Sequence, residues 1–151
     1  MVRALEEQSS APFPDPHRRF VIEVADGGMG PGCGMFSIED AVADAPEWTG
    51  ALSSPFCYGD EDARAAITKR LGGDKYFMLP VPGETPGGCL LLAYTGCGCF
   101  DVLVTNGEQE STVWYFDTRQ LFPYHDKQGH QVRFFDWYDE WLDGWLCHLR
   151  A

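Results

Sequence analysis

The spacing of apolar residues changes several times along the chain, and each change marks an element. Residues 1–12 contain the polar run EEQSSAP and no apolar periodicity, so we expect a flexible lead-in. A helix is predicted from Asp15, a good N-cap, with Pro16 at the first helical position and Gly27 as its stop. Its predicted apolar face consists of Phe20, Val21 and Val24.

Two further helices are predicted in the first half of the chain. One runs from Glu39 to about Ala45, with Ser37 as its cap and Pro46 at its end. The other lies in the segment YGDEDARAAITKRLGG, residues 58–73. Acidic residues stand at its start and basic residues near its end, as the helix dipole favours.

Residues 76–117 have a different pattern, in which short runs rich in Val, Leu, Thr and aromatic residues alternate with turn signals. The runs are YFMLP, GCLLLAYT, CFDVLVTN and STVWYFD, separated by Pro-Gly, Gly-Cys-Gly and Asn-Gly. This pattern predicts a central antiparallel sheet, with Asn106-Gly107 in the turn between the last two strands. With helices before and after the sheet, the predicted fold class is α+β.

The last segment, FFDWYDEWLDGWLCHLR, is typical of an amphipathic helix. Its apolar positions recur every three or four residues and acidic residues fall largely between them. They are Phe134, Tyr138, Trp141, Trp145 and His148 or Leu149. We expect this aromatic face to cover the sheet. If Trp114 and Trp145 are both buried, replacing either with alanine should cost about 3 to 5 kcal/mol.

Composition and charge narrow the class of protein. A chain of 151 residues is long enough for one domain with its own core. The formal net charge of −12 disfavours direct binding to nucleic acid and favours a basic protein partner. The sequence shows neither a secretory leader nor an apolar run that could cross a bilayer, so we expect a cytoplasmic protein without membrane contact, monomeric or weakly dimeric. Its six cysteines are then expected to be free thiols, most of them buried.

The Cys97-Gly98-Cys99 turn is the first candidate for chemistry. A structural zinc site needs a second pair of ligands at matching spacing, and the sequence contains no C-x-x-C or C-x-x-H partner. No histidine or basic residue lies nearby in sequence to activate a thiolate. We therefore expect a tight connection between two strands, with small thiols filling space, and no metal.

Two other patterns are weak candidates for an active site. The run GGMGPGCG, residues 27–34, follows the end of a helix and lacks Gly-Lys-Ser/Thr, so it predicts a turn with glycines at positive φ and no phosphate site. Three carboxylate pairs lie in segments expected to be exposed, Glu61/Asp62, Glu108/Glu110 and Asp139/Glu140. We expect a protein without cofactor or enzymatic activity.

Five short motifs, grouped in three stretches of the chain, occur in a characteristic order from about residue 13 to residue 147. Phe13-Pro14 leads through a helix into the glycine-rich turn, a Gly-Cys-Gly turn then joins two strands, and a Val-Trp and a Trp-Leu pair follow. In this order the motifs resemble the SUKH superfamily, whose founding members are the fungal Smi and Knr cell-wall regulators. The matching structural positions are Gly28, Gly30, Pro31, Gly34, Gly96, Cys97, Gly98, Trp114, Trp141 and Trp145. Most family members have a further helix before this segment, for which only Met1 to Gln8 is available here.

The resemblance implies a single non-enzymatic domain over residues 13–151. Bacterial members are regarded as immunity proteins that bind and neutralise polymorphic toxins, so the expected partner is a cognate toxin domain, preferably a basic nuclease because the chain is acidic. The candidate partner-binding residues are Glu108, Glu110, Asp136, Asp139, Glu140 and Asp143. Two alternatives stay open: a regulatory scaffold of the Smi/Knr type with an endogenous partner, and a thiol or metal enzyme that uses Cys97, Cys99 or the histidines.

Overall fold

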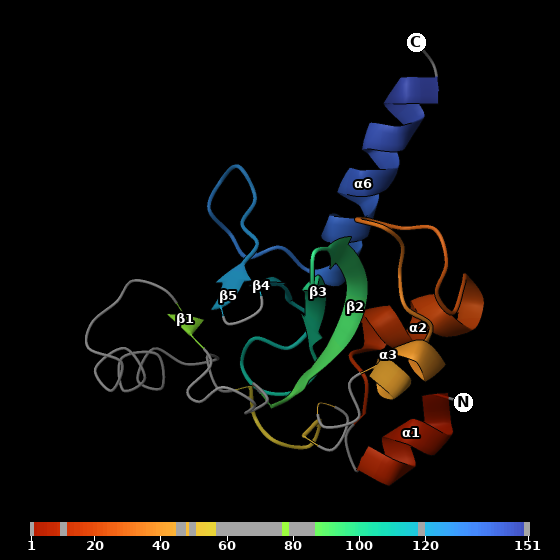
Figure 1. The fold of residues 1–151 in the computed structure, drawn as a ribbon, viewed down its shortest axis with the longest axis vertical. Helices are drawn as coiled ribbons and strands as arrows, with labels where there is room; N and C mark the ends of the chain where they lie inside the picture. The colour runs from red at the N-terminus through yellow and green to blue at the C-terminus, as the bar shows by residue number, and fades with distance from the viewer. Residues whose placement is uncertain are drawn as a thin grey trace.

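An antiparallel sheet forms the centre of the fold, with helices packed against it (Figure 1). The computed structural model describes residues 2–9, 12–44, 48, 51–56, 77–78, 87–117 and 120–149. The helices are α1 (Val2–Ser9), α2 (Asp15–Glu23), α3 (Ile38–Asp44) and α6 (Phe134–Leu149). The strands are β1 (Phe77–Met78), β2 (Cys89–Gly96), β3 (Cys99–Val104), β4 (Val113–Asp117) and β5 (Gln120–Pro123). The predicted α+β class is confirmed.

The sheet has the strand order β1-β5-β4-β3-β2. Strands β2 to β5 follow one another in chain order, and every pair is antiparallel. The first predicted run, YFMLP, contains β1, which pairs with β5 and not with β2, so a simple up-and-down order of the four predicted runs is wrong for this strand. The sheet extends beyond its predicted end at residue 117, because β5 pairs with β4 and places Leu121 opposite Phe116. Sequence reasoning missed β5 because the run is four residues long, ends in Pro123 and has no glycine turn before it.

The Gly-Cys-Gly turn is confirmed as the connection between β2 and β3. Gly96 pairs with Cys99, which leaves Cys97 and Gly98 as a two-residue loop. Both loop residues have positive φ, 55° for Cys97 and 78° for Gly98, as a type I′ hairpin turn requires. Asn106 and Gly107 also occupy the predicted turn between β3 and β4, where the Asn106 side chain donates a hydrogen bond to the Ser53 carbonyl.

The alternation of side chains along the strands divides the core into two clusters, one on each face of the sheet. Val102, Val104 and Trp114 lie in the first cluster, which α1, α3 and the side chains of Trp48, Leu52 and Phe56 cover. Leu103 and Val113, one residue out of step, lie in the second cluster, together with Phe20 of α2 and residues of α6. Both faces of the sheet are therefore buried.

Residues 2–9 form helix α1, so the prediction of a flexible lead-in is wrong for this segment. Val2 and Leu5 are buried in the first cluster. The Glu6 carboxylate accepts hydrogen bonds from the Phe13 backbone N–H at 3.1 Å and from the Arg18 Nε at 3.2 Å. A helix of eight residues is stable only through such tertiary contacts, which explains why its own sequence carried no clear signal.

Helices α2 and α3 lie close to their predicted positions. In α2, Pro14 is the N-cap in place of Asp15, and the buried residues are His17 and Phe20. Val24 lies beyond the end of α2 and is exposed, so its predicted place on the apolar face is wrong. The predicted cap of α3 is confirmed, because the Ser37 Oγ accepts a hydrogen bond from the Asp40 N–H. The helix predicted over residues 58–73, its Glu61/Asp62 pair and Cys57 lie outside the described residues.

The glycine-rich loop, residues 27–34, is the predicted turn. Four of its glycines, Gly27, Gly28, Gly32 and Gly34, have positive φ. A Cβ on Gly27 would lie 2.5 Å from the Ser37 nitrogen, and one on Gly32 would lie 2.5 Å from the Tyr94 carbonyl oxygen. The loop is held against β2 by a hydrogen bond from the Cys33 N–H to that same Tyr94 oxygen. Gly30 and Pro31 are buried within it.

Candidate protein-binding surface

Helix α6 projects away from the rest of the fold and carries the C-terminal end to its tip (Figure 1). Only its first turn is buried, through Phe134 and Trp137. Trp145 is 47% exposed and Leu149 is 73% exposed. The prediction that the aromatic face covers the sheet therefore holds for the start of the helix and is wrong for residues 142–149, here called the outer half of α6.

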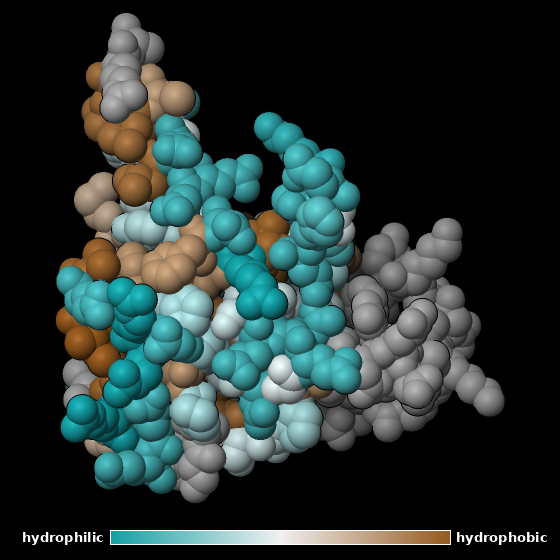
Figure 2. Space-filling model, turned by 180° about the vertical axis from the view of Figure 1, so that it is seen from behind, coloured by the Kyte–Doolittle hydropathy of each residue, from teal (hydrophilic) through white to brown (hydrophobic). Residues whose placement is uncertain are grey.

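Helix α6 as a whole has an apolar side and an acidic side. Because residues three, four and seven positions apart share a helix face, Trp141 and Trp145 continue the stripe that begins at buried Phe134. Leu142, Leu146 and Leu149 widen that stripe and are exposed. The four acidic residues Asp136, Asp139, Glu140 and Asp143 fall on the other side and are exposed. Figure 2 shows apolar side chains along one side of the projecting helix and hydrophilic ones along the other.

A groove of about 460 Å³ separates α6 from the glycine-rich loop. Trp141 and Trp145 form its wall on the helix side, and the loop forms the opposite wall with Met29 and Cys33. Met29 is 71% exposed although it is a large apolar residue. The two structural motifs that sequence reasoning identified separately, the glycine-rich loop and the final tryptophans, thus meet at one surface.

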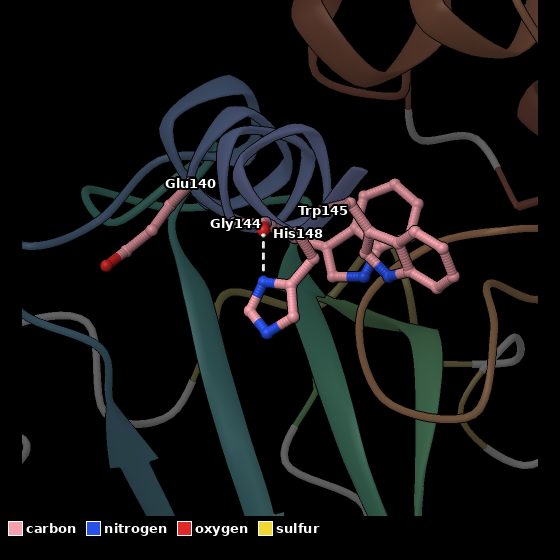
Figure 3. A pocket seen from close by; sticks show the side chains of 5 residues that line it. Glu140, Gly144, Trp145 and His148 are labelled. Carbon is pink, nitrogen blue, oxygen red and sulfur yellow. Dashed lines mark hydrogen bonds between the residues drawn. The ribbon is translucent and has the colours of Figure 1, made fainter. Parts of the chain in front are cut away.

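A second pocket, of about 410 Å³, lies on α6 itself and is lined by Glu140, Trp141, Gly144, Trp145 and His148. Viewed along the helix, Glu140 extends to one side and the Trp145 indole to the other, with the His148 imidazole between them (Figure 3). The ring centroids of Trp141 and Trp145 are 6.2 Å apart. His148 Nδ1 lies 2.9 Å from the Gly144 carbonyl oxygen. Since a carbonyl only accepts, Nδ1 carries the proton and Nε2 of the neutral ring is an acceptor.

The predicted partner-binding residues are exposed but do not form one cluster. Glu108 and Glu110 are exposed on the turn between β3 and β4, and neither lines a groove beside α6. Of the acidic residues on α6, only Glu140 lines the second pocket. Sequence reasoning did not single out Met29, Cys33 or Gly144 as surface residues. A glycine in the middle of the helical run WLDGWL was the one available signal.

The cysteines do not show the predicted burial. Of the five described, Cys89 and Cys99 are buried, whereas Cys33, Cys97 and Cys147 are exposed, and all five are free thiols. The space-filling role predicted for the Gly-Cys-Gly-Cys thiols is therefore confirmed for Cys99 and wrong for Cys97. The Cys99 Sγ donates a hydrogen bond to an oxygen of the Asp117 carboxylate, at 3.6 Å.

Two buried titratable residues fasten the start of α6 to the body. The His17 ring packs edge-to-face on Phe134 at 5.0 Å, and burial lowers its pKa to about 4. Its Nδ1 has no hydrogen-bond partner among the described residues. The Asp101 carboxylate accepts hydrogen bonds from the Tyr124 hydroxyl, at 2.8 Å, and from the Trp137 side chain. Burial is the main cause that raises the pKa of Asp101 to about 6.

Metal sites and membrane spans are two other kinds of functional element to consider in the described part of the chain. It holds no group of three or more His, Cys, Asp or Glu side chains arranged to bind a metal ion. None of its helices has the length and apolar character needed to cross a membrane. Comparisons with protein-family models, curated proteins and solved structures find no match. Function is therefore inferred from the residues of this chain.

Proposed function

We propose that this protein is a non-enzymatic binding module of the immunity type, which neutralises a basic toxin domain by binding to it directly in the cytoplasm. The observation that carries the proposal is the exposed surface of α6 from Asp136 to Leu149. It exposes tryptophan and leucine side chains next to an entirely acidic set of charges. Exposed aromatic residues in a contiguous apolar patch are typical of protein interfaces.

The charge of the chain supports a basic partner. The formal net charge is −12, and on α6 the charged residues from position 134 to 149 are all acidic. Complementary charge accelerates encounter and disfavours acidic partners, while the apolar contacts supply most of the affinity. The resemblance to the SUKH superfamily suggests which kind of basic protein the partner is. It is a toxin domain, and we prefer a nuclease.

The proposal predicts that a basic toxin is encoded beside this gene, and the test is coexpression of the two proteins. We expect the host to survive, and a complex of the two proteins to elute as one species in size-exclusion chromatography. If the toxin still kills the host and no complex forms, the proposal is wrong. A regulatory scaffold would instead capture an endogenous partner and give a growth phenotype on deletion without any toxin.

Charge-reversal variants distinguish which of the two acidic regions, α6 or the β3–β4 turn, binds the basic partner. Replacing Asp139 and Glu140 with lysine should change the free energy of unfolding by no more than about 0.5 kcal/mol, because both side chains are exposed, and should slow association with the basic partner. The matched variant carries Glu108→Lys and Glu110→Lys on the β3–β4 turn. Stopped-flow association rates at low and high salt measure both. Equal rates for wild type and the α6 variant would contradict the use of α6.

A further inference from the structure

The floor of the pocket on α6 is a glycine in the interior of a helix. Gly144 lies between Trp141 and Trp145, and a Cβ placed on it would meet no atom of another described segment within 4 Å. Packing therefore does not require glycine here. Glycine in a helix interior is destabilising relative to alanine. Gly144 therefore lowers the stability of α6, and its missing side chain leaves the pocket open.

The walls of the pocket offer three kinds of contact. The indoles of Trp141 and Trp145 present apolar ring faces, Glu140 presents a carboxylate, and His148 presents Nε2 as an acceptor. Neither indole nor the Glu140 carboxylate is a cationic donor. A long side chain with an apolar stem and a planar cationic head matches the set. Its stem and head would lie over the indoles, and its N–H groups would reach Glu140 and His148.

We infer that this pocket is the anchor for an arginine side chain of the basic protein partner. The inference rests on the proposed function, since it takes the occupant from that partner. Arginine fits better than lysine because its planar guanidinium both stacks on indole rings and donates several hydrogen bonds in a fixed direction. Charge complementarity favours it over an apolar occupant, because the Glu140 carboxylate attracts a cationic head and gives an apolar side chain no comparable attraction.

A second copy of this chain is a poorer occupant. Each copy carries a net charge of −12, and the outer half of α6 offers no lysine or arginine for the acidic pocket of its partner. Pairing two such helices would bring like charges together, which costs free energy. Self-association is therefore an outcome that would count against the inference.

The direct test uses two blocked peptides, acetyl-Ala-Arg-Ala-amide and its citrulline counterpart, which has nearly the same shape without the charge. The chain has five tryptophans, so the indole N–H region of an NMR spectrum contains five signals to follow. We expect the Trp141 and Trp145 signals to shift with the arginine peptide, with a Kd on the order of 1 mM, and to stay in place with the citrulline peptide.

Three variants locate the binding. Gly144→Leu puts a side chain on the floor, at a position where a Cβ meets no atom of another described segment within 4 Å, and should abolish the shift of both indole signals. Trp145→Ala should abolish the shift of the remaining Trp141 signal, and Glu140→Gln should weaken binding about threefold, as for an exposed ion pair. Glu39→Gln on α3 and Ile22→Ala on α2 are exposed matched controls and should bind like the wild type.

Four outcomes would overturn the inference. They are equal shifts with both peptides, shifts with neither, unchanged binding by Gly144→Leu, and indole signals that change with protein concentration when no peptide is present. The results that would contradict the proposed function differ from those that would contradict the arginine pocket. If the toxin forms no complex but the arginine peptide binds as described, the pocket is supported and the toxin is not the partner. If the complex forms with the same affinity for wild type and Gly144→Leu, the partner is supported and the pocket is not its anchor.

Discussion

The two ends of α6 carry the same kinds of side chain and meet opposite surroundings. At its start, Phe134 is fully buried and Trp137 is 7% exposed. Two turns later on the same helix, Trp145 is 47% exposed. The difference lies in what faces each end, because α2 and the sheet cover the first turn, whereas the outer half extends past them (Figure 1).

This comparison teaches that an apolar stripe can serve two purposes on one helix. The buried turn is fixed by edge-to-face contacts of Phe134 with His17 and Phe20 and by the hydrogen bond from Trp137 to Asp101. Among the described residues, no comparable ring contact or side-chain hydrogen bond joins the outer half to the body of the protein. The first turn holds the helix at a defined angle, and the outer half presents the remaining stripe to a partner.

The largest expected effect comes from a tryptophan on the buried side of the comparison. Trp114 is fully buried, its Nε1 donates to the Thr112 hydroxyl at 3.1 Å, and its ring packs on Phe56. Trp114→Ala should lower the free energy of unfolding by about 3 to 5 kcal/mol because it leaves a cavity and an unpaired hydroxyl acceptor. Urea unfolding followed by circular dichroism measures the loss. A loss below about 1 kcal/mol would mean that this core position is misplaced.

His17 makes the contact with α6 sensitive to pH. Its pKa is lowered to about 4 in the fold, so the unfolded chain binds the proton more tightly, and stability is lost as the pH falls from about 6.5 towards 4. His17→Phe keeps the aromatic contacts and removes the titration. Relative to this variant, wild type should lose on the order of 3 kcal/mol by pH 4. Urea midpoints at pH 7, 5.5 and 4 measure the difference.

The control for that experiment is His125→Gln, because His125 is exposed in the loop before α6. The control should follow the wild-type pH dependence at every step. Parallel curves for wild type and His17→Phe would show that the buried imidazole does not titrate as its surroundings require. The stability of the contact at the start of α6 would then not depend on whether His17 is neutral.

The stability contribution of Asp101 depends on pH in the opposite direction to that of His17. The folded-state pKa of Asp101, about 6, lies above the usual 3.8, so its protonated form stabilises the fold, and that contribution is lost as the pH rises through 6. Asp101→Asn keeps an acceptor for Tyr124 and Trp137 and removes the buried charge. It should gain on the order of 2 kcal/mol at pH 7, and the gain should disappear below pH 4. A loss of stability at both pH values would contradict this interpretation.

The sheet was predictable because its signals are local. Three of the predicted runs became β2, β3 and β4, and the Cys97-Gly98 and Asn106-Gly107 turns join them, since both turn types require residues that tolerate positive φ. The α1 helix and β5 were missed because short elements depend on partners distant in sequence. Val2 and Leu5 stand at helical spacing, but two positions in eight residues are too few to identify a helix, and both are buried in the first core cluster.

The candidate surface was harder to predict for a related reason. Periodicity correctly gave the α6 stripe, but it carries no information on where the body of the protein ends. The expectation that Trp145 is buried therefore failed, while the same rule succeeded for Phe134. Exposure of the six predicted acidic residues followed from their charge, and their division between the β3–β4 turn and α6 needed the tertiary structure.

The smallest expected effect is on the exposed side of the comparison. Trp145→Ala should change the free energy of unfolding by less than about 1 kcal/mol, because the side chain has little to lose on truncation apart from its contact with Trp141. It should nevertheless weaken the complex with the basic partner by at least about tenfold, as exposed tryptophans at interface centres do. Thermal melts and isothermal titration on the same preparation give both values. A destabilisation close to that of Trp114→Ala would show that the outer half of α6 packs on its own chain, and the surface proposed for the partner would then be part of the core.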